Sequence, residues 1–107
     1  WSRYWKDHDT YNTNPPGIGM AAARWVVDKK ASMIGSDQWA TEVIPNPDAR
    51  LAFPIHQELI TKNGIWNLES MNLESLSQDE AYEFLFIHTP IRFKGATGSP
   101  ARPIAIR

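Results

Sequence analysis

The sequence predicts an α/β fold with a mixed sheet and flanking helices. Two observations predict it: helical patterns over residues 18–29 and 54–63 each lead into a short apolar stretch, at 31–37 and 65–69. A helix that leads into such a strand is half of a βαβ unit. Because the chain has 107 residues, we expect one domain with one core.

Composition excludes several classes of protein. A net charge of −1, with basic residues scattered among acids, argues against a general binder of nucleic acid or of anionic membranes. The absence of cysteine excludes disulfides, thiolate metal sites and a thiol nucleophile. It also suits a reducing compartment, and we expect a cytoplasmic protein. The apolar runs are shorter than the roughly 20 residues of a membrane helix.

The first fourteen residues are unusually aromatic for a chain end. The chain starts at Trp1 rather than methionine, so we expect a processed product, a proteolytic fragment or a partly observed protein. If this segment is helical, Trp1, Tyr4 and Trp5 share one face. They then form either a cap packed on a neighbouring element or the wall of a substrate pocket or chain interface. His8, among charged residues, is expected at the surface.

A turn at residues 14–17 contains two prolines and a glycine, and precedes the first helix. The residues after the strand at 31–37 lie where α/β proteins place ligand-facing side chains. Asp37 and Glu42 are the carboxylates there, and each could equally be a loop cap or a surface acid. Residues 45–50 are a proline-rich loop.

The stretch 53–69 carries the two residues of most chemical interest. Pro54 opens its helix, Asn63-Gly64 ends it, and a buried strand follows. His56 lies at the helix start, where the helix dipole favours the neutral, ligating imidazole, although a packed or capping role is common for such a histidine. Glu69 ends the strand, where ligation, an arginine partner or exposure would relieve the cost of a buried carboxylate.

The remaining candidates for a site are weak. The three histidines, His8, His56 and His88, have no short chelating spacing, so the chain alone does not provide a three-ligand metal site. The glycine-rich loop at 95–100 lacks the Gly-Lys-Ser/Thr ending of a phosphate loop. No Gly-x-Ser-x-Gly motif supports a serine hydrolase.

The last third of the chain is expected to be mainly strand. Residues 70–76 form a connection, and residues 77–80 form a polar turn or a short helical start. Residues 82–88 are the strongest strand, aromatic and β-branched. A half-exposed strand at 91–94 and an edge strand at 103–107 flank the glycine-rich loop.

Several separated blocks of the sequence resemble one family, the cyclase-like metal-dependent hydrolases, which include bacterial kynurenine formamidase and isatin hydrolase. The blocks are Asn14-Pro15-Pro16-Gly17 with Ala21-Ala22-Ala23-Arg24-Trp25, Gly35-Ser36-Asp37-Gln38-Trp39, Phe53-Pro54-Ile55-His56-Gln57-Glu58-Leu59, Asn63-Gly64-Ile65, Leu68-Glu69-Ser70-Met71-Asn72-Leu73-Glu74, Tyr82-Glu83-Phe84-Leu85-Phe86 and Gly95-Ala96-Thr97-Gly98-Ser99-Pro100-Ala101-Arg102-Pro103.

The resemblance implies that residues 1–107 are the C-terminal portion of a single domain with the swivelling β/β/α cyclase-like fold. The family's motif His-x-Gly-Thr-His-x-Asp-x-Pro-x-His, which provides most metal ligands, is absent from this sequence. By position, His56 and Glu69 correspond to the later histidine and glutamate that complete the metal site. The interval between them is one residue longer than in the formamidase branch.

The implied function is hydrolysis of an amide or lactam C–N bond by water activated on zinc or manganese. His56 would ligate the metal or steer the catalytic water, and Glu69 would ligate the metal or hold a hydrogen bond to a ligand. An acid/base histidine belongs to the absent motif. Trp1, Trp5 and Trp39 would line a pocket for a small aromatic amide.

The resemblance also implies partners. We expect the missing N-terminal portion, present in the same protein or as a separate chain, to be required for arylformamidase-like activity, so this chain alone would be inactive. A homo-oligomer is expected. The alternative is a truncated or degenerate family member that acts as a non-catalytic structural or assembly subunit.

Overall fold

The computed structural model describes residues 1–107 and divides them into two compact units, residues 1–74 and 75–107. Helices and short strands occur together, in agreement with the α/β prediction. The strands do not form one mixed sheet, however, because they pair as two separate two-stranded sheets. No helix has both the length and the apolar character needed to cross a membrane.

The first unit opens with two short helices, α1 (Ser2–Lys6) and α2 (His8–Asn12). The Asp7 carboxylate caps α2 by accepting a hydrogen bond from the Thr10 N–H (3.1 Å). Hydrogen bonding with the Thr10 side chain, and then with this N–H, lowers the pKa of Asp7. The rings of Trp1 and Tyr4 stack with centroids 5.2 Å apart. Trp5 and Tyr11 each meet Tyr4 edge to face. The aromatic residues therefore gather along these helices.

Both predicted helix-to-strand successions are confirmed. Helix α3 (Met20–Asp28) leads into β1 (Met33–Gly35). Helices α4 (Pro54–His56) and η1 (Gln57–Lys62) lead into β2 (Trp66–Leu68). Strands β1 and β2 pair in parallel, with Met33 opposite Trp66. The strand at β2 is not fully buried as expected, because the Trp66 side chain is 55% exposed.

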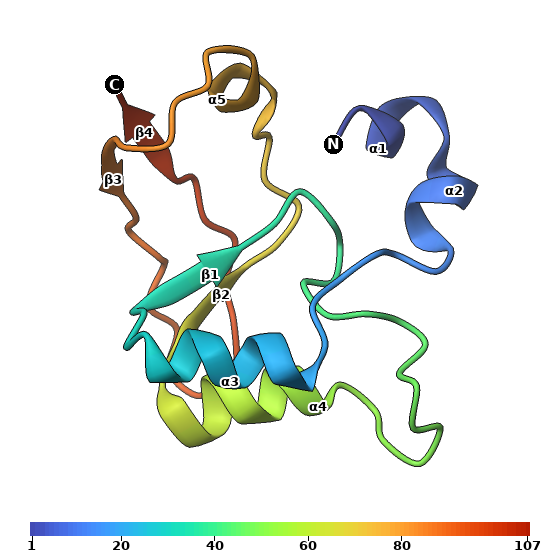
Figure 1. Ribbon diagram of the computed structural model, residues 1–107. Coiled ribbons are helices and arrows are strands. Elements are labelled where there is room, and N and C mark those ends of the chain that lie inside the picture. Colours follow the sequence, from blue (N-terminus) through green and yellow to red (C-terminus); the bar gives the residue numbers. More distant parts are fainter. The chain divides into compact units, whose positions relative to one another are not determined.

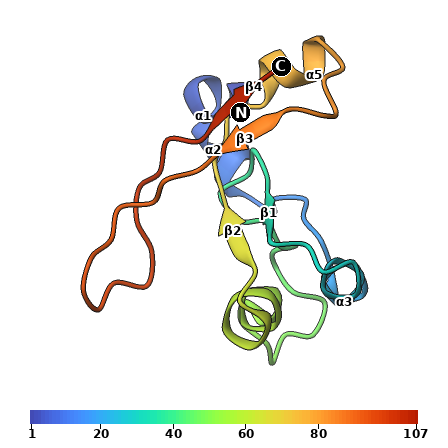
Figure 2. The same ribbon diagram turned by 90° about the vertical axis from the view of Figure 1, so that its left-hand side faces the viewer.

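The core of this unit lies between its helices and β2. Figures 1 and 2 show α3 beside the helix formed by α4 and η1, with β1 and β2 above them. Five buried side chains form the cluster: Ala23, Val26, Ile55, Leu59 and Ile65. Ile18, Val27, Ala31 and Ile34 pack against it. Because Ile55 and Leu59 lie one turn apart, the helix that carries His56 is anchored through its apolar side.

The helix at 54–63 is wound differently from the prediction. It starts as one α-helical turn and continues as a π-helix from Gln57 to Lys62. Short π-helical segments are uncommon and often occur at functional sites. His56 is the last residue before the change. Gly64, with φ of 64°, takes the left-handed conformation as the chain leaves the helix.

Helix α5 (Glu74–Gln78) starts at the last residue of the first unit and continues into the second, which contains β3 (Leu85–Ile87) and β4 (Ile104–Ile106). Strands β3 and β4 are antiparallel, which confirms the strands expected near 82–88 and 103–107, although each is shorter. The strand expected at 91–94 does not form. That segment has no pairing strand, so its backbone is not held in a ladder. The helical start expected at 77–80 lies earlier, at Glu74.

The β3–β4 pair presents an apolar face. Its register places Leu85 opposite Ile106 and Ile87 opposite Ile104. Directly opposed residues point to the same side of a sheet, so all four belong to one face. Each of the four side chains is at least 38% exposed. Arg107 forms an ion pair with Asp79 elsewhere in this unit.

Candidate functional site

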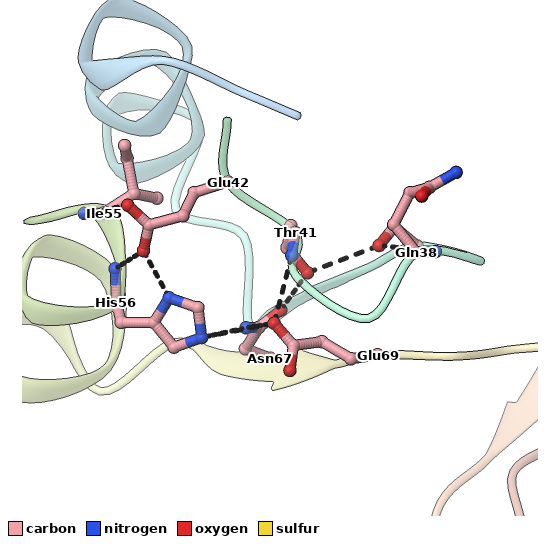
Figure 3. A network of polar contacts seen from close by, with 8 residues as sticks. Gln38, Thr41, Glu42, Ile55, His56, Asn67 and Glu69 are labelled. Atoms are coloured by element: carbon pink, nitrogen blue, oxygen red, sulfur yellow. Dashed lines mark hydrogen bonds and ion pairs between the residues drawn. The ribbon is translucent and has the colours of Figure 1, made fainter. Parts of the chain in front are cut away.

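His56 lies between two glutamates, as Figure 3 shows. On one side, its Nδ1 forms a hydrogen bond with Oε1 of Glu42. On the other, its Nε2 lies 3.2 Å from Oε1 of Glu69. The imidazole is 25% exposed, whereas Glu42 is 1% exposed. The structure thus brings together the two residues expected from the resemblance and adds Glu42 to them.

A close backbone approach places Glu42. The Ile18 N–H donates to the Thr41 carbonyl (3.0 Å) and the Val43 N–H donates to the Ile18 carbonyl (3.1 Å), so the two segments form a short parallel bridge. A Cβ atom on Gly17 would lie 2.2 Å from the carbonyl carbon of Glu42. Only glycine allows this approach, which fixes the segment that carries the carboxylate.

Glu42 caps the helix that carries His56. The residue at the N-cap position is Phe53, whose side chain has no acceptor, and Pro54 follows it. The first backbone N–H groups of a helix need acceptors from outside the helix. Glu42 provides both: Oε2 accepts from the Ile55 N–H (3.2 Å) and Oε1 from the His56 N–H (3.1 Å). These bonds, with that of the imidazole, offset the cost of burying the carboxylate.

The same carboxylate orients the ring of His56. An ionised carboxylate only accepts hydrogen bonds, so the shared proton belongs to Nδ1 in the neutral imidazole. Nε2 then carries the lone pair. It faces Glu69 and the side-chain amide of Asn67, whose Nδ2 is 3.3 Å away. Glu42 therefore selects the tautomer that presents Nε2 as a base or a ligand.

Glu69 is held by its own set of donors. Its Oε1 accepts from the Thr41 N–H (3.0 Å) and from Nδ2 of Asn67 (3.1 Å). Thr41 also donates through Oγ1 to Oδ1 of Asn67 (2.7 Å), which fixes the orientation of the amide. Thr41 is buried, while the Glu69 side chain remains 30% exposed. This leaves part of the carboxylate accessible beside Nε2 of His56.

The metal implied by the resemblance can be tested against these donors. Two ligands that share a zinc or manganese ion at about 2.0–2.2 Å lie roughly 3.0–3.5 Å apart. His56 Nε2 and Glu69 Oε1, at 3.2 Å, have this separation and suitable chemistry. The structure contains no group of three or more His, Cys, Asp or Glu side chains arranged to hold a metal. These residues therefore match two ligands, not a complete site.

The other residues named from the sequence lie outside this network. The Asp37 carboxylate is 3.0 Å from the amino group of Trp1, and the Asp37 carbonyl accepts from the Tyr11 hydroxyl. Trp5 is 67% exposed, and the indole N–H of Trp39 is buried without a hydrogen-bond partner. His8 is exposed, as expected. The assignment of the three tryptophans to a substrate pocket stays a prediction.

Sequence reasoning missed Thr41 and Asn67. Asn67 could have been found, because it lies two residues before Glu69 on an extended segment, and residues i and i+2 project to the same side. Thr41 gave no such signal. Its backbone N–H and hydroxyl act together only because the chain folds back onto β2.

Comparison with known families gives one match. Residues 1–43 match the family model Cyclase, described as "Putative cyclase". Comparisons with curated proteins and with solved structures gave no match. The matched segment includes Glu42 and supports a relation to the cyclase family at a coarse level. It ends before His56 and Glu69, so the family match does not itself cover these two residues.

Proposed function

We propose that this chain provides part of the active site of a metal-dependent hydrolase that cleaves an amide or lactam C–N bond. The match of residues 1–43 to a cyclase family supports an enzymatic role. The resemblance of the later segments supports the choice of an arylformamidase-like reaction on a small aromatic substrate. The proposal includes the cytoplasmic location and the homo-oligomeric state expected from the sequence.

The observation that carries the proposal is the bond between Glu42 and Nδ1 of His56. Histidines that bind metals usually donate the other ring N–H to a carboxylate or carbonyl, which fixes the tautomer and raises the basicity of the ligating nitrogen. Here the carboxylate is buried and also holds the backbone of His56. The ring can neither rotate freely nor exchange tautomers without breaking this bond.

Each residue of the network has a distinct task in the proposal. His56 Nε2 and the Glu69 carboxylate would hold zinc or manganese, and the hydrogen bond from Asn67 keeps the Glu69 carboxylate beside Nε2. The metal, when bound, supplies a water of lowered pKa and polarises the substrate carbonyl.

Two ligands do not complete a catalytic metal site, which generally has three protein ligands. We therefore propose that further donors come from outside residues 1–107, namely from a polypeptide that carries the histidine-rich motif of the family. The isolated chain is then inactive and binds metal weakly.

The test is metal binding and hydrolysis of formanilide, a simple aryl formamide. The chain is measured alone and after co-expression with a cyclase-family polypeptide that carries the histidine-rich motif. We expect weak zinc or manganese binding and no hydrolysis by the chain alone, and stoichiometric metal and activity in the complex. His56→Ala and Glu69→Ala should abolish both in the complex.

The matched control is His8→Ala, which removes an exposed histidine outside the network. It should leave metal content and rate unchanged. Stoichiometric metal in the isolated chain would show that the site is complete and overturn the requirement for a partner. A complex that forms but binds no metal would instead favour the structural-subunit alternative.

A further inference from the structure

A pocket of about 290 Å³ opens beside the network. Its walls come from one continuous segment between Glu42 and the helix start, and nearly all of its lining side chains are apolar. Of the nine lining side chains, only Glu42 and Asn46 are polar, and the apolar ones include Leu51 and Phe53. The volume is near the lower end for small-molecule sites, which are usually apolar cavities with a few polar groups.

Two residues connect this pocket to His56. Glu42 lines the pocket and also binds Nδ1 of His56. Phe53 lines it as well, and its ring meets the imidazole edge to face with centroids 5.4 Å apart. A molecule in the pocket therefore contacts the same residues that orient the histidine. Leu51 and Phe53, 48% and 44% exposed, leave apolar surface accessible there.

The backbone at Phe53 has an unfavourable conformation. Its φ of 52° lies in the left-handed region, which side chains other than glycine rarely adopt. Such residues are found at ligand-binding and active sites, where the surroundings hold them in place. Phe53, in this conformation, contacts the imidazole of His56 and lines the pocket.

The charges around the pocket restrict what it can bind. Its lining contains one carboxylate, Glu42, and no cation. The nearby Arg50 is paired with Asp48 through Nε (2.9 Å) and Nη2 (2.7 Å), and this pairing lowers the pKa of Asp48 and raises that of Arg50. A carboxylate or phosphate on a ligand would find no counter-charge in this lining and would be repelled by Glu42.

We infer that this pocket binds the uncharged apolar ring of a small ligand, and that Leu51 and Phe53 determine which ring is accepted. The inference rests on the proposed function for the chemistry that follows binding, because the bound ring is then the non-reacting part of the hydrolase's substrate. It does not depend on a metal, since the lining residues all belong to this chain.

The experiment maps binding to the full chain by NMR, with ¹⁵N-labelled protein and no metal. Three probes are compared: formanilide, which has a neutral ring; benzoate, which has a ring and a negative charge; and formamide, which has no ring. We expect formanilide to shift the amide signals of residues 43–53 and of His56 in a saturable way. Benzoate and formamide should bind at least tenfold more weakly.

Two variants test the role of the lining. Phe53→Gly removes the ring and suits the left-handed backbone, and Leu51→Ala shortens an exposed side chain. Each should weaken formanilide binding about three- to tenfold. The control Ile60→Ala changes a side chain of similar exposure that does not line the pocket, and should bind as the wild type does.

Shifts that map elsewhere, no saturable shift, or equal binding of benzoate would overturn the inference. So would unchanged affinity in both variants. Its failure is distinguishable from failure of the proposed function. Ring binding here without hydrolysis in the complex would retain the pocket and reject the hydrolase. Hydrolysis of formanilide in the complex with no dependence on Leu51 or Phe53 would retain the hydrolase and reject the pocket as the binding site of the ring.

Discussion

At the scale of single residues, Glu42 organises the candidate site. One buried carboxylate caps a helix, fixes a tautomer and lines the adjoining pocket. Buried carboxylates are costly unless several donors satisfy them. Three donors do so here, and all come from Ile55 and His56. The stability of the first unit and the geometry of the site therefore depend on the same side chain.

Replacement of Glu42 by glutamine tests this dependence. The amide has nearly the same shape but one acceptor oxygen, so it leaves one donor of the helix start or of the imidazole without a partner. We expect a loss of about 1–3 kcal/mol in the free energy of unfolding. Urea titration followed by tryptophan fluorescence measures it. The metal affinity of the complex should also fall, by roughly 10–100-fold.

The matched control for this variant is Glu58→Gln. Glu58 forms an ion pair with Lys62 on the surface of η1, and the lysine is 65% exposed. Exposed pairs contribute at most about 1 kcal/mol, so this variant should remain close to the wild type. Equal effects of the two substitutions would show that Glu42 has no special structural role.

At the scale of elements, the helices were more predictable than their contacts. The periodicity of residues 18–29 and the Pro54 and Asn63-Gly64 signals are local, and both helices formed where they predicted. The π-helical winding and the cap on α4 were not predictable. The cap comes from Glu42, which is 13 and 14 residues away from its partners, and no local pattern marks such a pair.

The strands were overpredicted for a related reason. Residues 91–94 alternate in polarity as a strand should, but a strand also needs a neighbour to pair with, and β4 pairs with β3 instead.

For the site, the resemblance selected His56 and Glu69, while residue chemistry left their roles open. Thr41 and Asn67 act through contacts made only in the folded chain.

The bridge between Ile18 and Glu42 is the element that aligns the site, and Gly17→Ala tests it. The added methyl group would meet backbone atoms at 2.2–2.5 Å, which cannot move aside as a flexible side chain can. We expect a destabilisation of about 1–3 kcal/mol or more. The NMR signals of the His56 ring should change as well, because Glu42 is displaced.

Gly98→Ala provides the comparison for this glycine. A methyl group at position 98 has nothing within 4 Å, and its backbone is not in the left-handed region. The free energy of unfolding of the Gly98→Ala variant should stay within about 0.5 kcal/mol of that of the wild type. If Gly17→Ala behaved in the same way and left the His56 signals unchanged, the close approach would not be what places Glu42.

At the scale of the whole molecule, the buried apolar side chains are unevenly distributed. All seven lie between residues 11 and 65, and none belongs to residues 75–107. Buried apolar area is the main source of stability. The first unit should therefore unfold cooperatively, whereas the β3–β4 pair, whose apolar face is exposed, should open locally at lower free energy.

Leu59→Ala separates these two behaviours. Leu59 is 1% exposed at the centre of the core, so the substitution leaves a cavity and should cost about 2–4 kcal/mol. In hydrogen exchange, the amides of α3 and η1 should lose protection by that amount. The amides of β3 and β4 should exchange as in the wild type, because they do not need the core to unfold before they open.

Ile60→Ala, one residue further along the same helix, is the control. Ile60 is 43% exposed, so its loss should have little effect on either set of amides. If Leu59→Ala reduced the protection of β3 and β4 as much as that of α3, the two units would unfold together. Stability would then be shared across the chain, and a weakened core would affect every part of it equally.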